Sequence, residues 1–177
     1  MLIKSNIDYV TLVDQMLPAF KGHLRILHDV EDESIKLYLA AAIDAISTYA
    51  DQDIFFTEYN FRYMDLDYSM PSSLLGWYTG KVNIFDVIIQ DEVGTDLTME
   101  YTIDGERGLI YPHPIYNLVQ FKSGYQDMIE IPPNLLNIIF RLGADFFENR
   151  ETNRVGEPKA LPGWVEYSIA SVWKARV

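Results

Sequence analysis

Two carboxylates, Asp65 and Asp67, are the best candidates in the sequence for acid–base chemistry. They would project from the same side of an extended strand, between Tyr63 and Tyr68. Glycosidases hold two such carboxylates across a sugar ring, and aromatic faces often stack on sugars. The chain has 26 acidic residues, however, so pairs of this kind arise by chance. A carbohydrate-active enzyme is therefore one alternative, but we expect solvated surface carboxylates and no catalysis.

Other catalytic and metal-binding patterns are not found in the sequence. The histidines His23, His28 and His113 are too scattered for a metal-binding pair at helical spacing, and none belongs to an H-E-x-x-H pattern. The chain has no cysteine, which excludes disulfides, thiolate metal sites and a cysteine nucleophile, and fits a reducing compartment. It also lacks a G-x-S-x-G elbow and the glycine-rich phosphate-binding loops. We expect no cofactor and no metal.

The charge of the chain bears on its partners. The formal net charge is −12, whereas affinity for DNA comes mainly from clustered Lys and Arg, so tight DNA binding is not expected. Residues 53–130 carry 13 acidic and 4 basic side chains, and residues 131–177 carry 5 acidic and 6 basic ones. Acidic loops of this kind often serve solubility alone. A monomeric acidic adaptor, or an inhibitor that mimics DNA, is a second alternative.

The length and the hydropathy pattern favour one cytoplasmic folding unit. The chain has 177 residues, within the range of a single domain or a domain with an insertion. The first ten residues lack the apolar run of a signal peptide, and charges interrupt later stretches before membrane-spanning length. We expect no membrane partner.

The N-terminal part predicts two helices. Residues 32–51 have helical periodicity, and we expect Asp29 to cap this helix and the acidic residues 31–33 to favour its positive end. Pro18 is expected to open a shorter helix that runs to about Leu24. The apolar stripe of the longer helix contains Ile35, Leu39, Ala42, Ile43, Ile46 and Tyr49.

Alternation replaces helical periodicity from about residue 53 to residue 126. Tyr59, Phe61 and Tyr63 fall on one side of a strand, and further strands are expected at 82–89, 98–103, 107–111 and 115–122. Asp104-Gly105 predicts a tight hairpin turn with positive φ values. The dense aromatic residues of segment 55–78 admit two explanations: a core beneath the sheet or a protein-binding surface. We leave both open.

The helix predicted over residues 134–150 has a narrow polar face. Asn137, Arg141, Asp145 and Glu148 form one thin stripe, and apolar side chains cover most of the remaining circumference. Such a helix must be covered on more than one side, either by helices of the same chain or by a neighbouring subunit. After Pro162-Gly163 we expect a closing helix, which carries Trp164 and Trp173.

Two blocks of sequence resemble the head-to-tail connector, or head-completion adaptor, proteins of tailed phages. The first block consists of His23-Leu24-Arg25-Ile26, Asp29, Glu31-Asp32-Glu33, Ile35, Leu39, Ala40-Ala41-Ala42-Ile43 and Tyr49. The second consists of Gly124-Tyr125, Ile131-Pro132-Pro133, Leu135, Leu136 and Ala144-Asp145-Phe146-Phe147-Glu148-Asn149-Arg150. The blocks span about a third of the chain. The stretch between them departs from the family pattern, because it is longer than in compact members.

The resemblance implies a structural virion protein. Connectors of this family form a homo-oligomeric ring below the portal protein, bind a tail or stopper protein on the other side, and let double-stranded DNA pass. A virion location follows, with assembly in the host cytoplasm. Acidic walls would suit such a channel, because they repel phosphate over about a Debye length. We expect subunit or partner contacts from Arg141, Glu148, Arg150, Arg154, Trp164, Trp173, Tyr59, Phe61 and Tyr63.

These observations together predict an α+β fold. Helices from segments 17–52 and 132–176 should form a small bundle, and strands from about 54–125 should form an inserted antiparallel β region. We expect one connector domain over residues 1–177, and no reaction catalysed.

Overall fold

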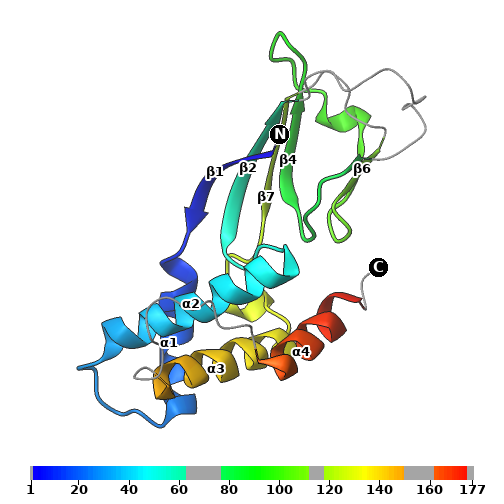
Figure 1. The fold of residues 1–177 in the computed structure, drawn as a ribbon. Helices are drawn as coiled ribbons and strands as arrows, with labels where there is room; N and C mark the ends of the chain where they lie inside the picture. The colour runs from blue at the N-terminus through cyan, green and yellow to red at the C-terminus, as the bar shows by residue number, and fades with distance from the viewer. Residues whose placement is uncertain (1, 63–76, 112–117, 150–161, 175–177) are drawn as a thin grey trace. The chain divides into compact units, whose positions relative to one another are not determined.

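The computed structural model describes residues 2–62, 77–111, 118–149 and 162–174 (Figure 1). The chain divides into two compact units. The β unit comprises Met1–Asp8 and Phe55–Gly124, and the helical unit comprises Tyr9–Ile54 and Tyr125–Val177. The predicted α+β class is confirmed. That the two units act as one connector domain stays a prediction.

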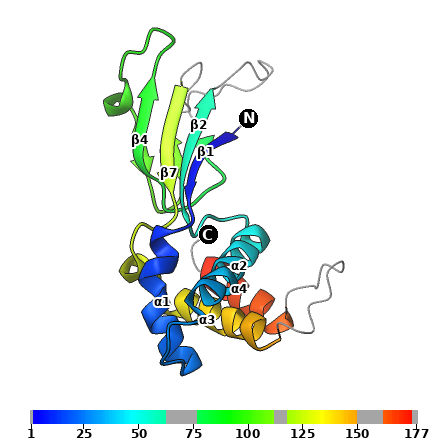
Figure 2. The same cartoon turned by 90° about the vertical axis from the view of Figure 1, so that its left-hand side faces the viewer.

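The described residues of the helical unit form four α-helices. They are α1 (Thr11–Leu24), α2 (Asp32–Ala50), α3 (Pro133–Glu148) and α4 (Gly163–Lys174), with a short 3-10 helix, η3 (Met128–Glu130), before α3. N-terminal and C-terminal segments thus share one bundle, as predicted (Figure 2). Its core contains Leu12, Met16, Phe20, Ile35, Leu39, Ile43, Ile46, Leu135, Ile139, Leu142 and Val165, each 2% exposed or less.

Helix α2 agrees with its predicted range but not with its predicted cap. Ile35, Leu39, Ala42, Ile43 and Ile46 are buried as expected, whereas Tyr49 is 49% exposed. The residue at the N-cap is Glu31, and it makes no side-chain capping bond. The carboxylate of Asp29 does not cap the helix; it accepts a hydrogen bond from Lys21. The acidic first turn, Asp32 and Glu33, is present as predicted.

The prediction that Pro18 opens a helix was wrong. Helix α1 begins at Thr11 and carries Pro18 in its interior. Proline there removes one backbone hydrogen bond. The apolar stripe of Leu12, Val13, Met16 and Phe20 is buried along α1, and this burial outweighs the local cost of the proline.

The wide apolar surface of α3 is covered largely by helices of the same chain. Helices α1, α2 and α4 all pack against it. Phe140 contacts Phe20 of α1, with ring centroids 5.4 Å apart, and Phe147 meets Tyr38 of α2 edge-on at 5.9 Å. Of the two alternatives, helices of the same chain or a neighbouring subunit, helices of the same chain therefore cover most of the apolar surface of α3.

In the described part of the β unit the strands form two antiparallel sheets. The larger has the strand order β1-β2-β7-β4, from β1 (Leu2–Asp8), β2 (Phe56–Arg62), β7 (Leu118–Ser123) and β4 (Phe85–Gln90). The smaller has the order β3-β6-β5, from β3 (Trp77–Tyr78), β6 (Leu109–Tyr111) and β5 (Thr102–Asp104). The N-terminal strand β1 was not predicted. It pairs with β2, so the β region is more than an insertion at 54–125.

The β5–β6 hairpin also differs from the prediction. Residues 98–100 form a 3-10 helix, η2 (Thr98–Glu100), where a strand was expected. The turn is not the tight two-residue turn expected at Asp104-Gly105, because four residues separate β5 from β6. Asp104 accepts the backbone N–H of Arg107, and the positive φ falls on Gly108, at 65°.

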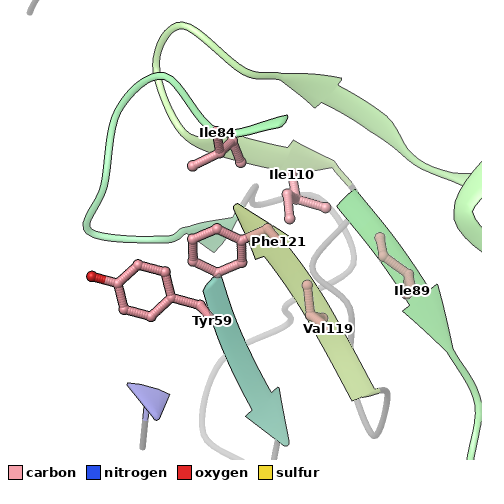
Figure 3. Close-up of a cluster of buried hydrophobic side chains, with 6 residues drawn as sticks. All are labelled: Tyr59, Ile84, Ile89, Ile110, Val119 and Phe121. Atoms are coloured by element: carbon pink, nitrogen blue, oxygen red, sulfur yellow. The ribbon is translucent and has the colours of Figure 1, made fainter. Parts of the chain in front are cut away.

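The core of the β unit lies at the inner face of the larger sheet. Figure 3 shows Tyr59 from β2, Val119 and Phe121 from β7, and Ile89 from β4 together with Ile110 from β6 and Ile84. The rings of Tyr59 and Phe121 stack at 5.0 Å. The smaller sheet therefore contributes to the cover of one face of the larger one.

Candidate interaction surfaces

Helices α3 and α4 bring two of the predicted contact residues together. The guanidinium of Arg141 lies over the ring of Trp164, 4.2 Å from its centroid. Arg141 is exposed and Trp164 is partly buried. A planar guanidinium on an aromatic face keeps N–H groups at its edge, which suits a carboxylate from another molecule.

Tyr167 extends this surface, although the sequence analysis did not select it. It follows Trp164 by three residues on α4, so both side chains lie on one side of the helix, and Tyr167 is 81% exposed. Arg, Trp and Tyr are the residues most enriched at binding hot spots. We call Arg141, Trp164 and Tyr167 the α3–α4 patch.

The remaining predicted contact residues of the C-terminal segment do not join this patch in the part of the structure that is described. Glu148 is exposed at the end of α3. Arg150 and Arg154 lie outside the described residues. Trp173 belongs to α4, but its side chain is not among those described.

The predicted aromatic contacts of the β unit have a different environment. Tyr59 is 2% exposed and belongs to the core cluster, and Phe61 is partly buried against that cluster. For these two residues the structure favours the core explanation. Tyr63 lies outside the described residues, as do Asp65 and Asp67, the candidate carboxylate pair.

The loop between α1 and α2 carries the most exposed apolar side chains of the helical unit among the described residues. Leu27 is 98% exposed and Val30 is 90% exposed. Neither residue was predicted as a contact from the sequence, although both are apolar and lie between two predicted helices, outside the apolar stripe of either. We call Leu27 and Val30 the loop patch.

Several hydrogen bonds hold this loop in place. Arg25 ends α1 in a left-handed conformation, with φ 59°, and Ile26 N–H bonds to the carbonyl of Lys21. The ammonium of Lys21 donates to Asp29 Oδ1 and Asp32 Oδ1, each at 2.6 Å. Hydrogen bonds to Asp29 and then Asp32 raise the pKa of Lys21, and the bond from Lys21 lowers the pKa of Asp29. The loop patch is therefore fixed to both helices.

The acidic segment of the β unit uses several carboxylates to shape its own backbone. Asp91 accepts the N–H groups of Val93 at 2.9 Å and Thr95 at 2.7 Å, and hydrogen bonds with Thr95 are the main reason that its pKa is lowered. Asp96 Oδ1 accepts hydrogen bonds from the hydroxyl of Thr98 at 2.6 Å and from its backbone N–H at 2.9 Å, and these bonds, chiefly that of the hydroxyl, lower the pKa of Asp96. Residues 82–106 contain seven acidic and no basic side chains. These two carboxylates stabilise turns, and the segment as a whole stays strongly anionic.

A groove of about 450 Å³ lies along strands β2, β7 and β4 of the larger sheet. Glu58, Asn60, Asp86, Ile88, Gln120 and Lys122 are among its lining residues. Lys122 Nζ contacts Asp86 Oδ2 at 3.0 Å and lies 5.6 Å from the centroid of the Phe56 ring. The lining thus mixes amides and opposite charges with apolar side chains, among them Val87 and Ile88, which is suited to contact with a protein surface.

The described residues contain neither a metal-binding cluster nor a membrane-spanning helix. In the four described ranges, no group of three His, Cys, Asp or Glu side chains is placed to hold a metal ion. Among the described helices, none is long and apolar enough to cross a membrane.

The comparisons with known proteins find similarity at the level of structure. No protein-family model and no curated protein matches the chain. A chain from the neck of an empty gene transfer agent (GTA) particle computed with C6 symmetry has a TM-score of 0.66 at 18% identity, with 97% of this chain and 94% of that chain covered. A chain from the neck of the native particle computed with C12 symmetry has a TM-score of 0.64 at 16% identity, with 98% of this chain and 94% of that chain covered.

A third chain, from the virion of the native gene transfer agent particle, has a TM-score of 0.62 at 17% identity, and the match covers 98% of this chain and 94% of that chain. Each of the three matches thus extends over nearly the whole length of both chains compared. The connector resemblance seen in the sequence is thus matched by a fold shared with chains of particle necks.

Proposed function

We propose that this chain is a structural subunit of the junction between head and tail of a phage-like particle. In this proposal it forms a ring, binds the portal protein on one side and a tail or stopper protein on the other, and extends the channel for double-stranded DNA. It catalyses no reaction. The observation that carries the proposal is the fold shared with chains from particle necks over 97–98% of this chain.

The charge distribution supports the same role. A net charge of −12 disfavours tight binding to DNA, and a channel must let DNA pass without holding it. The acidic segment 82–106 is anchored to its own turns by Asp91 and Asp96, so its charges are held on an ordered backbone. An anionic wall of this kind repels phosphate at short range.

Exposed residues of the types found at protein interfaces also support an associative role. The α3–α4 patch combines Arg, Trp and Tyr, and the loop patch exposes two aliphatic side chains on a fixed backbone. The exposed aliphatic side chains are costly to leave in water, and Arg, Trp and Tyr are the residue types enriched where proteins bind one another.

Deletion of the gene for this chain from the genome that encodes the particle tests the proposal. We expect DNA-filled heads and free tails to accumulate, visible by negative-stain electron microscopy, and joined particles to return when the gene is supplied in trans. Complete, infectious particles without this protein would contradict the proposal.

A further inference from the structure

The helical unit carries two exposed patches that differ in chemistry. The loop patch, Leu27 and Val30, is aliphatic and is flanked by Asp29 and Glu33, whose side chains are 87% and 88% exposed. The α3–α4 patch consists of a guanidinium stacked on an indole and an exposed phenol. An apolar surface with an acidic rim is complementary to an aromatic surface with a cation.

The charges placed at the two patches follow the same division. The acidic residues 31–33 follow the loop, and Asp29 and Glu33 are exposed beside Leu27 and Val30. At the α3–α4 patch the charged group is the guanidinium of Arg141, stacked on Trp164. The loop patch of one copy and the α3–α4 patch of another therefore carry opposite charges, whereas contact of two loop patches would bring carboxylates together.

The two patches also lie apart on the helical unit. Figures 1 and 2 show the α1–α2 loop and helix α4 separated in both views. A contact between two different surfaces of identical subunits is heterologous, and it closes into a ring when the rotation between neighbours permits. One copy can thus use both patches at once, each with a different neighbour.

We infer that the loop patch of one subunit docks on the α3–α4 patch of a second copy of this chain. Leu27 and Val30 pack against Trp164 and Tyr167, and Arg141 donates to the carboxylates that flank the loop. The Lys21 bonds to Asp29 and Asp32 hold the loop in its docking conformation before contact, which reduces the entropy lost on association. This inference rests on the proposed ring and names its interface.

Engineered cysteines test the contact directly, because the natural chain has none. A double variant with Leu27→Cys and Tyr167→Cys, treated with a short bismaleimide at high protein concentration, should give a ladder of covalent oligomers on a denaturing gel. Leu27→Cys alone and Tyr167→Cys alone should give no ladder. An equal mixture of the two single variants should give a dimer that goes no further.

A matched control uses Met99→Cys in place of Tyr167→Cys. Met99 is 100% exposed in the β unit, so random collisions link it to Leu27→Cys at least as readily, and we expect only background dimer. Both positions in the test pair are highly exposed, and circular dichroism should show unchanged folding.

The possible failures can be told apart. If native mass spectrometry shows rings of the wild-type chain but the test pair links no better than the control, this interface is wrong and the proposed ring stands. Strong dimerisation of Leu27→Cys alone overturns the heterologous contact in favour of a symmetric one. If the wild-type chain neither oligomerises nor cross-links at any concentration, and also fails to do so with the purified portal protein of the same particle, the proposed ring fails and this inference with it.

Discussion

The Lys21 ammonium holds the α1–α2 loop through two carboxylates, and this contact depends on pH. Because the pKa of Asp29 is lowered in the fold, its contribution is present above its ordinary value of 3.8 and is lost as pH falls through the lower folded value. Because the pKa of Lys21 is raised above 10.5, its contribution is present below that pH and is lost as pH rises through the folded value. The loop should therefore stay fixed across the whole neutral range.

Replacement Lys21→Met should loosen the loop without unfolding α1 or α2. We expect faster hydrogen exchange at the amides of residues 26–32, measured by mass spectrometry at neutral pH, because both ion pairs are lost while the helical core remains. Lys122→Met, which removes an ion pair in the β unit, is the control and should leave these amides unchanged. Equal protection of the loop in Lys21→Met and wild type would show that Lys21 does not hold it.

Alanine substitutions at Gly94 and Gly108 compare the cost of backbone strain alone with the cost of strain plus a steric clash. Gly94 and Gly108 both have positive φ, but a Cβ on Gly94 meets open space, whereas one on Gly108 would lie 1.7 Å from the carbonyl oxygen of Lys81. Gly94→Ala should cost about 1 kcal/mol of unfolding free energy from strain alone. Gly108→Ala should cost clearly more, and urea denaturation followed by fluorescence measures both. Equal costs would mean that the Lys81 carbonyl moves away freely.

The sequence identified the aromatic residues of segment 55–78 but did not predict which of their rings are buried. Alternation put Tyr59, Phe61 and Tyr63 on one side of a strand and left core and surface equally open. The choice depends on a second sheet built from residues 77–111, which covers that side of Tyr59. Such cover comes from residues distant in sequence, and periodicity within one strand does not report it.

Helix α3 approaches α1 closely at Gly143. A Cβ on Gly143 would lie 2.9 Å from Cζ of Phe20, a ring in α1 that is fully buried. The absence of a side chain at residue 143 therefore lets α1 and α3 approach closely.

Gly143→Val should destabilise the helical unit, because the added methyl groups overpack this contact. We expect a loss of about 1–3 kcal/mol in urea denaturation. Gly22→Ala is the matched control in α1: its Cβ meets nothing within 4 Å, and the better helix propensity should add up to about 1 kcal/mol. A Gly143→Val protein as stable as wild type would contradict close packing of α1 on α3.

Elements that depend on local sequence signals were predicted accurately, whereas elements that depend on contacts between distant segments were not. Helix α2 was predicted within one residue because its stripe and acidic first turn are local signals. Strand β1 was missed because its partner, β2, lies about fifty residues away in the sequence. Pro18 was misread because burial of Met16 and Phe20 against other helices overrides a local preference. The paired Arg141 and Trp164 were both selected from sequence, but their contact needed the fold of α4 on α3.

For the whole molecule, the fold and the charge support one account. The chain shares its fold with neck chains of gene transfer agent particles, and its surplus of acidic groups is unsuited to gripping DNA. Because α3 is extensively covered within the chain, the contacts of the proposed ring would come from surfaces that remain exposed, such as the loop patch and the α3–α4 patch. Association through such limited patches is expected to depend on protein concentration.

Native mass spectrometry of the purified chain over a wide concentration range tests the ring most directly. We expect one closed oligomer of fixed subunit number that grows at the expense of monomer as concentration rises, with annular particles in negative stain. A chain that stays monomeric at every concentration, and also in the presence of the purified portal protein of the same particle, would contradict the proposed ring.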